Sequence, residues 1–225
     1  QADQASEQAR HDHASNEAAL LWQAASETGT STYLTRKGVK AYGLRFASDG
    51  CVLVPMVDAA DKLWNLQRIF PRKPANGGTD KIGLKGARKS GCFHWCGDPA
   101  GASVLLVAEG YATAASVHQA TGRPVAVAFD AGNLPHVAKA LHQAHPAALI
   151  VLCGDDDLQT FAEKGRNPGR DKATAAARAV AGLAVFPEGL PAGASDFNDQ
   201  HAAAGLDAVR LTLEAAIEAH QAAQT

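Results

Sequence analysis

The stretch SVLLVAEGYATAASVHQATGRPVAVAFD, residues 103–130, decides the fold, together with ALIVLCGDDD at residues 148–157. Short apolar runs lie at 103–108, 124–129 and 148–153, and each is separated from the next by a segment of helical length and pattern. Apolar strands that alternate with helices in this way are typical of βαβ units. The second half of the chain is therefore predicted to be an α/β domain, a parallel sheet with helices on both faces.

The pattern extends outward on both sides. A loop is expected at 154–169, and a helix RDKATAAARAVAG, a short run LAVFP and a last helix over about 202–222 follow it. Upstream, the β-rich runs CVLVPMV (51–57), KLWNLQRIF (62–70), KIGL (81–84) and CFHW (92–95) indicate a small, mostly antiparallel subdomain. The predicted organisation is an N-terminal helical segment at 1–32, a basic α+β subdomain at 33–100, and the α/β domain with its C-terminal helix at 101–225.

The charge of the chain is unevenly distributed. The formal net charge of −2 conceals net charges of −4 over residues 1–33, +8 over 34–95 and −6 over 96–225. The total of −2 alone would argue against a nucleic-acid partner, whereas the basic segment favours one. Basic residues there interleave with aromatic ones, a combination that suits single-stranded DNA. The candidate stacking residues are Tyr42, Phe46, Trp64, Phe93 and Trp95.

The acidic residues of the second half follow the predicted strands. Glu109 comes after the first strand, Asp130 after the second and Asp155-Asp156-Asp157 after the third, and Asp196 precedes the last helix. Because the carboxyl ends of parallel strands meet at one edge, we expect several carboxylates to converge there. Such oxygen ligands suit Mg²⁺ or Mn²⁺. Residues two apart on an extended segment point the same way, so Asp155 and Asp157 are expected to share a metal while Asp156 points elsewhere.

These residues carry a family resemblance. The motifs VAEGYATAAS, AFDAGNL and LIVLCGDDD resemble the Toprim domain of bacterial primases, topoisomerases and some nucleases. A fuller series resembles the primases of conjugative plasmids, integrative mobile elements and related phages, over about residues 22–205. Its members are YLTRKGV, AYGLRF, VLVPMVD, LWNLQRIF, EGYATAAS, GDDD, NPGRDKA and SDFND.

The resemblance implies roles for individual residues. It makes Glu109 an acid/base or metal-linked group and Asp155 and Asp157 the Mg²⁺ ligands, so that these three are the candidate catalytic residues, and it adds Asp196 as a further acidic position at the metal. It also implies that Arg68 and Lys81 line a channel for template and nucleotide. Three further basic residues, Lys85, Arg88 and Lys89, would extend that surface.

The function expected from these features is that of a DNA-dependent primase core. Mg²⁺-dependent nucleotidyl transfer needs metals that neutralise charge on the phosphates, and the template needs a positive groove. The expected partners are single-stranded DNA and NTPs, with a helicase or relaxase, in cis or in trans, as a further candidate. A metal-dependent nuclease and a non-catalytic single-stranded DNA-binding module remain as alternatives.

Several residues have a simpler structural interpretation. Asp130 could cap a local turn, Asp156 could serve only as a neighbouring charge, and Asn198 is as well suited to capping the last helix as to binding a ligand. The spacing Cys92-x-His94-x-Cys96 fits no common zinc site and favours a plain strand. The segment GLKGARKS (83–90) departs from a phosphate-binding P-loop, because Arg88 occupies a glycine position.

Composition excludes other classes. No apolar stretch approaches the length of a membrane span, and the N-terminal segment is too polar for a secretory signal. Four cysteines at irregular spacing suggest reduced thiols and a cytoplasmic protein. The chain begins with Gln1 rather than Met, which suggests a piece of a longer protein.

Overall fold

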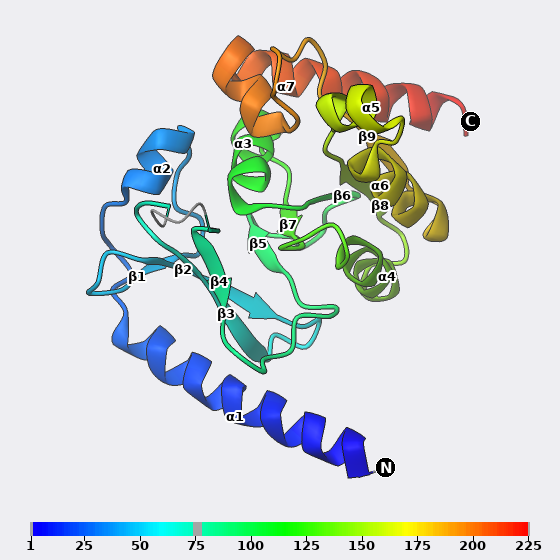
Figure 1. The fold of residues 1–225 in the computed structure, drawn as a ribbon. Coiled ribbons are helices and arrows are strands. Elements are labelled where there is room, and N and C mark those ends of the chain that lie inside the picture. Colours follow the sequence, from blue (N-terminus) through cyan, green and yellow to red (C-terminus); the bar gives the residue numbers. More distant parts are fainter. Residues whose placement is uncertain (1, 74–77, 225) are drawn as a thin grey trace. The chain divides into compact units, whose positions relative to one another are not determined.

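Two separate sheets organise the chain in the computed structural model, which describes residues 2–73 and 78–224 (Figure 1). One sheet has four strands in the order β1-β2-β3-β4, and the other has five in the order β5-β7-β6-β8-β9. They belong to two units, Gln1–His94 and Trp95–Thr225. Residues 1, 74–77 and 225, which the predicted domain ranges include, lie outside the described residues.

The first unit is built on the antiparallel sheet that the sequence predicts. All three neighbouring strand pairs in it are antiparallel. A short helix within the segment predicted as mostly β was missed by the sequence analysis. The elements are α1 (Ala2–Ala24), α2 (Thr32–Lys37), β1 (Arg45–Phe46), β2 (Val52–Val57), β3 (Leu63–Ile69) and β4 (Lys81–Gly83).

Helix α1 covers one face of this sheet. It packs against β3, and Ala18 and Ala25 form an apolar cluster with Leu53 and Leu66 of the central strands. Leu66 is fully buried, and a side chain of this size contributes roughly 1.5–3 kcal/mol when it leaves water. The N-terminal helix is thus an integral part of the first unit.

The second unit contains the predicted parallel sheet. Strand β6 pairs in parallel with β7 and β8, and β8 pairs in parallel with β9. Every residue of β6 is buried, as expected for a strand covered on both faces. The segment CFHW, predicted as part of the antiparallel subdomain, is divided between the two sheets. Phe93 forms an antiparallel bridge with Val57 of β2, whereas β5, which begins at His94, joins the five-stranded sheet. The strands are β5 (His94–Cys96), β6 (Val104–Ala108), β7 (Val125–Val127), β8 (Leu149–Cys153) and β9 (Leu183–Val185).

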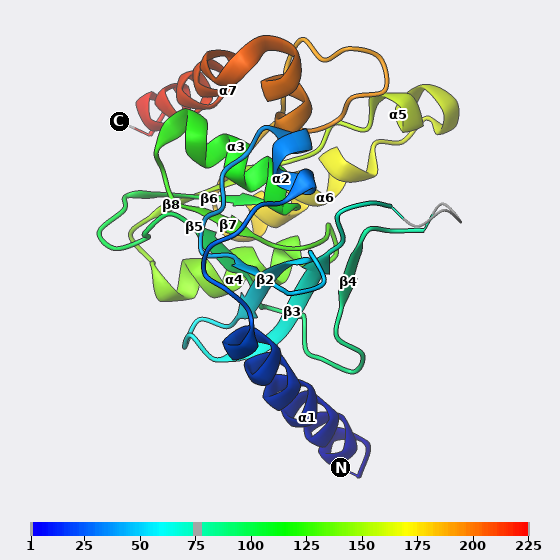
Figure 2. The same cartoon turned by 90° about the vertical axis from the view of Figure 1, so that its left-hand side faces the viewer.

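Helices cover both faces of the parallel sheet. Helix α3 packs against α7, and α4 packs against α6, so that the sheet lies between two helical layers. Figure 2 shows α3 and α7 on one side of the strands and α4 on the other. The segment expected as a loop after β8 contains one further short helix, α5. The helices are α3 (Tyr111–Thr121), α4 (Leu134–Ala144), α5 (Leu158–Lys164), α6 (Pro168–Ala179) and α7 (Phe197–Ala222).

Helix α7 begins at Phe197 rather than at the predicted Ala202, because the acidic loop before it supplies a cap. The Asp196 side chain accepts a hydrogen bond from the backbone N–H of Asp199, and the Asp199 side chain accepts one from the backbone of Asp196. The helix is interrupted at Gly205, whose φ of 85° and ψ of 170° lie in a region open essentially to glycine alone.

Two exclusions from the sequence can be compared with the structure. Among residues 2–73 and 78–224, no helix is both long enough and apolar enough to cross a membrane. All four cysteines are free thiols, and all four are buried.

Candidate active site

Three neighbouring parallel strands bring acidic residues to one edge of the five-stranded sheet. Ala108, the last residue of β6, is in register with the last residues of both β7 and β8. Glu109 follows β6 directly, Asp130 lies shortly after β7, and Asp155 lies shortly after β8. The structure therefore gathers these carboxylates at a common edge, as expected for a parallel sheet. We call Glu109, Asp130, Asp155 and Asp157 the acidic edge.

Glu109 lies in a negatively charged environment. Burial raises the pKa of its carboxyl group, and the charge of Asp130 raises it further. A hydrogen bond from the backbone N–H of Ala131 and the nearby charge of Lys172 act in the opposite direction and lower the pKa. Lys172, on α6, is a cation next to this edge that the sequence analysis did not single out.

Asp155 is the most strongly perturbed carboxylate described at this edge. Burial raises its pKa to about 8, and the charges of Glu109, Asp196 and Asp157 add to the effect. Its Oδ1 atom is buried and has no hydrogen-bond partner. A buried carboxylate oxygen without a donor is costly, so this atom calls for a cation or a proton.

These observations test whether the edge suits a divalent metal. Within the described residues, no three His, Cys, Asp or Glu side chains form a ready-made metal cluster. Mg²⁺ does not require one, because it usually takes only one or two protein carboxylates and completes its shell with waters and substrate phosphates. The unpaired Oδ1 of Asp155 and the mutual repulsion of the acidic edge fit such an ion.

The three consecutive aspartates divide as the alternation of an extended segment predicts. Asp155 and Asp157 both interact electrostatically with Glu109. Asp156 is buried and instead pairs with Arg170, whose Nε lies 2.9 Å from its Oδ1. The neighbouring-charge interpretation of Asp156 is therefore the one that fits its contacts.

The first turn of α6 contacts this segment closely. The backbone N–H of Gly169 donates to Oδ2 of Asp157 at 2.9 Å. A Cβ atom on Gly169 would lie 2.5 Å from the carbonyl oxygen of Asp155, so no side chain fits at this position. Glycine is thus required where α6 approaches the strand end.

Asp196 has a local structural role in addition to its place near Asp155. One oxygen accepts the capping bond from Asp199, and the other accepts a hydrogen bond from the Thr113 hydroxyl at 3.2 Å. Its predicted role as a metal ligand stays a prediction. Of the two roles considered for Asn198, capping is not observed, since the N-cap of α7 is Asp196. The buried Asn198 side chain donates to the Ser116 hydroxyl at 2.9 Å.

Asp130 is both a turn cap and a member of the acidic edge, the two roles considered for it from the sequence. Its Oδ1 atom accepts a hydrogen bond from the backbone N–H of Asn133 at 2.9 Å, which is the expected turn cap. At the same time its charge raises the pKa of Glu109, which places it at the acidic edge.

The predicted channel residues of the first unit do not lie together. In the pairing of β3 with β4, Arg68 is opposite Ile82, whereas Lys81 is opposite Ile69. Because successive residues of a strand face opposite sides, Arg68 and Lys81 point to opposite faces of the sheet. Arg68 forms an ion pair with Asp49.

The remaining predicted basic residues differ in their surroundings. Lys85 and Lys89 are exposed. The guanidinium of Arg88 lies 4.9 Å from the centre of the Trp64 ring, and the Lys62 ammonium lies 3.6 Å from it. Trp64 is buried between these cations, and Phe93 is also buried, so the proposal that these two rings stack on bases is wrong.

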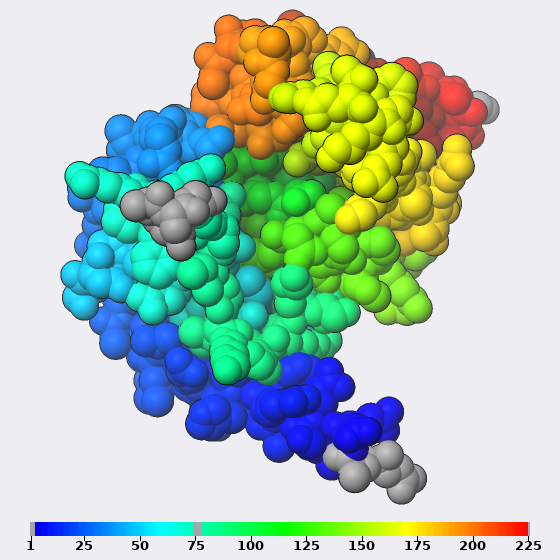
Figure 3. All heavy atoms as spheres, in the orientation of Figure 1, coloured from blue at the N-terminus to red at the C-terminus, as the bar shows by residue number. Residues whose placement is uncertain are grey.

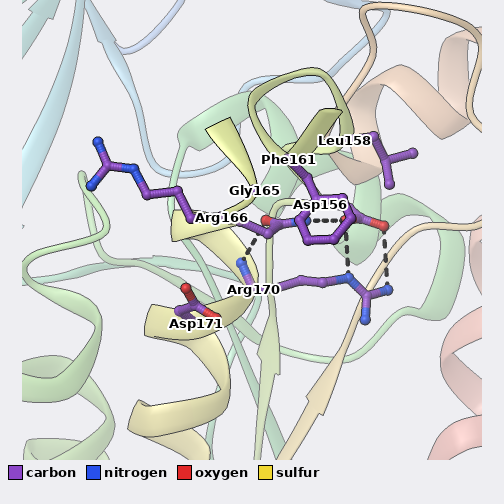
Figure 4. A pocket seen from close by; sticks show the side chains of 8 residues that line it. Asp156, Leu158, Phe161, Gly165, Arg166, Arg170 and Asp171 are labelled. Carbon is purple, nitrogen blue, oxygen red and sulfur yellow. Dashed lines mark hydrogen bonds and ion pairs between the residues drawn. The ribbon is translucent and has the colours of Figure 1, made fainter. Parts of the chain in front are cut away.

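A pocket of about 410 Å³ lies beside the aspartate segment, between α5 and the start of α6 (Figure 4). Helix α5, which forms one wall of the pocket, lies at the molecular surface and is drawn in yellow in Figure 3. Asn167 and Arg170, which belong to the motif NPGRDKA, line it, and the sequence alone assigns neither of them a role. A signal was present, because Asn before Pro is typical of a helix start. The lining residues are Asp156, Leu158, Phe161, Gly165, Arg166, Asn167, Arg170 and Asp171.

Comparison with known proteins agrees with this geometry. Residues 104–207 match the family model of the Toprim domain, which confirms the resemblance carried by the motifs at the strand ends. Two proteins of Escherichia coli named DNA primase TraC are 43% and 42% identical to the chain over 165 residues, or 71% of its length. The match spans only 11% and 15% of these relatives.

Solved structures share the fold. The DnaG primase catalytic domain bound to single-stranded DNA matches with a TM-score of 0.57 at 15% identity, covering 94% of this chain and 83% of that one. The DnaG catalytic core also matches with a TM-score of 0.57, at 16% identity, and covers 92% of this chain and 79% of that one. At these identities the likeness establishes the fold.

Proposed function

The chain carries a Toprim domain and resembles plasmid-type DNA primases, and from this premise we propose that it is the catalytic core of a DNA primase. The activity is the synthesis of short primers on single-stranded DNA by Mg²⁺-dependent nucleotidyl transfer. The observation that supports it most directly is the acidic edge, where the buried Oδ1 of Asp155 lacks any hydrogen-bond partner.

In this proposal Asp155 and Asp157 hold Mg²⁺ or Mn²⁺, and Asp196 lies close enough to Asp155 to assist. The ion would supply positive charge to the nucleotide phosphates during transfer. Glu109 is suited to accept the proton of the attacking 3′-hydroxyl, because its pKa is raised toward the working pH.

The basic first unit is proposed to bind the template strand and incoming NTPs. The proposed contacts are Arg68 on one face of the antiparallel sheet and Lys81 on the other, with Lys85, Arg88 and Lys89 as further contacts. The DnaG catalytic domain in one structural neighbour is bound to single-stranded DNA, which agrees with this partner. We further propose a cytoplasmic protein of a conjugative plasmid or a related mobile element, which works with a helicase or relaxase in cis or in trans.

The test is incorporation of labelled NTPs on single-stranded DNA with Mg²⁺ or Mn²⁺. We expect Asp155→Ala together with Asp157→Ala to abolish synthesis. Asp207→Ala together with Glu218→Ala is the matched control, since it removes the same charge from exposed positions of α7 and should leave synthesis intact.

Three results would contradict the proposal. Undiminished synthesis by the double variant of Asp155 and Asp157 would show that these two carboxylates are not the metal ligands that primer synthesis requires. Metal-dependent cleavage of DNA without incorporation would favour a nuclease. DNA binding without either reaction, together with no metal binding at the acidic edge, would favour a non-catalytic binding module.

A further inference from the structure

We propose that Asn167, the N-cap of α6, and Arg170, in its first turn, are positioning residues that hold Asp156 away from the acidic edge and thereby present Asp155 and Asp157 as its metal-binding pair. This inference rests on the proposed function.

The side chain of Asp156 is held by donors on one side of the aspartate segment. Its Oδ1 accepts hydrogen bonds from Asn167 Nδ2 at 2.6 Å and from Arg170 Nε at 2.9 Å. Its Oδ2 accepts a third from Arg170 Nη2 at 3.2 Å. Its backbone N–H also donates to the carbonyl oxygen of Ser195 at 2.7 Å. Both the main chain and the carboxylate of Asp156 are therefore fixed.

Asn167 joins the middle aspartate to the next one. While its Nδ2 donates to Asp156, its Oδ1 accepts from the backbone N–H of Asp157 at 3.1 Å and from that of Arg170 at 3.1 Å. One amide thus caps α6 and fixes the peptide from which the Asp157 side chain projects. Neither Asp nor Ala at 167 would reproduce this set, because the first lacks the donor and the second lacks both groups.

Arg170 has a fixed orientation of its own. Its guanidinium lies 4.2 Å from the centre of the Phe186 ring and meets Asp156 through two nitrogens. Figure 4 shows both bonds between Asp156 and Arg170. A lysine would keep the charge but not the planar fork that bonds two oxygens and stacks on a ring.

The arrangement has an electrostatic consequence for the metal. Asp156 is only 5% exposed, so its charge would be costly without these partners. If the partners were lost, the segment would have to rotate or re-hydrate, and the spacing of Asp155 and Asp157 would change with it. Residues that orient metal ligands typically affect metal affinity by about 10–100-fold.

The experiment measures Mn²⁺ affinity by calorimetry on the intact chain, alongside thermal unfolding. Arg170→Lys and Asn167→Ala are each expected to weaken Mn²⁺ binding by about 10-fold or more. Arg178→Lys, an exposed arginine near the end of the same helix, is the control and should match the wild type. The Mn²⁺ concentration for half-maximal primer synthesis should rise by the same factor in the two test variants.

A reciprocal pair of changes keeps the test valid if these variants fold poorly. Asn167→Asp alone places two carboxylates in contact and should weaken Mn²⁺ binding. Asp156→Asn added to it removes the like-charge contact and lets the amide at 156 donate to the carboxylate at 167. Because an amide offers Arg170 one acceptor oxygen in place of two, only part of the lost affinity should return. No loss in the single change, or no recovery in the double, would contradict the proposal.

The outcomes separate this inference from the proposed function. If folded Arg170→Lys and Asn167→Ala bind Mn²⁺ like the wild type and only their unfolding temperature falls, the two residues are structural and the positioning role is wrong. If Mn²⁺ binding by the wild type does not depend on Asp155 and Asp157, the metal site of the proposed function fails instead.

Discussion

At the scale of single residues, the burial of Asp155 makes the stability of the fold depend on pH. Its pKa is about 8 in the folded chain against 3.8 for an ordinary aspartate. Between these two values the folded state binds the proton more tightly than the unfolded state, so stability falls as pH rises from about 4 to 8.

Replacing this carboxylate should therefore stabilise the protein at alkaline pH. We expect Asp155→Asn to raise the free energy of unfolding by more than about 1 kcal/mol at pH 8.5 or so, and to change it little at pH 4, where the wild-type group is protonated. Urea unfolding at the two pH values measures the difference. Saturating Mg²⁺ should shrink the gap by stabilising the wild type alone. An equal effect of the substitution at both pH values would show that the burial of charge is not the cause.

Single residues also differ in whether their place in the site can be predicted from the sequence. The acidic edge could be predicted, because strand order and the alternation of side chains both follow from a local pattern. Asn167 and Lys172 could not be placed there, since their proximity to the edge depends on how far α6 leans toward the end of β8. Gly169 permits this approach, because a side chain there would collide with the carbonyl oxygen of Asp155. The sequence shows that residue 169 is a glycine, but it does not show that Asp155 lies against it.

At the scale of elements, the start of α7 offers a test that separates two roles of Asp196. We expect Asp196→Ala to lower stability by roughly 0.5–2 kcal/mol, because the capping bond to the backbone of Asp199 is lost. Asp196→Asn keeps an acceptor for that bond and should retain most of the stability. Thermal unfolding of both variants, with the exposed Asp207→Asn as a control, measures the effect.

Metal binding by the same variants completes this test. If Asp196 is a ligand, Asp196→Asn should weaken Mn²⁺ binding while the helix cap survives. Full Mn²⁺ affinity in Asp196→Asn would leave Asp196 as a cap only. Equal stability of Asp196→Ala and the wild type would instead contradict the capping role.

The elements that sequence reasoning missed are the short ones. Long apolar runs such as β6 and β8 and the long helices were predicted, because their periodicity extends over enough residues to be read. Helices α2 and α5 are only 6 and 7 residues long and depend on tertiary contacts. The run CFHW was predicted to lie in one sheet, but Phe93 bridges to β2 while β5 joins the five-stranded sheet, since local pattern identifies a strand but does not identify its neighbours.

At the scale of the whole molecule, uneven charge predicts how binding responds to salt. If the +8 segment carries the template, binding of single-stranded DNA should weaken as salt rises, despite the overall charge of −2. We expect Lys81→Ala and Arg68→Ala each to weaken binding and to make the slope of log affinity against log salt shallower by about 0.7. Fluorescence anisotropy over a range of salt concentrations measures both quantities.

Lys139→Ala is the control for this measurement, because Lys139 is an exposed lysine on α4, outside the basic segment. Unchanged slopes for both Lys81→Ala and Arg68→Ala would contradict the assignment of this surface to DNA. A change confined to one of them would restrict DNA to one face of the antiparallel sheet, since the two side chains point to opposite faces.

The contact of Asp156 with Asn167 and Arg170 also has an evolutionary consequence. A change at only one of these three positions leaves a buried charge or amide without its hydrogen-bond partner. Joint changes can instead produce a different set of three side chains whose hydrogen bonds are all formed. Related chains are thus expected to vary at 156, 167 and 170 as a correlated group. The aspartates on either side of position 156 should be retained independently of that group, because the chemistry at the metal constrains them directly.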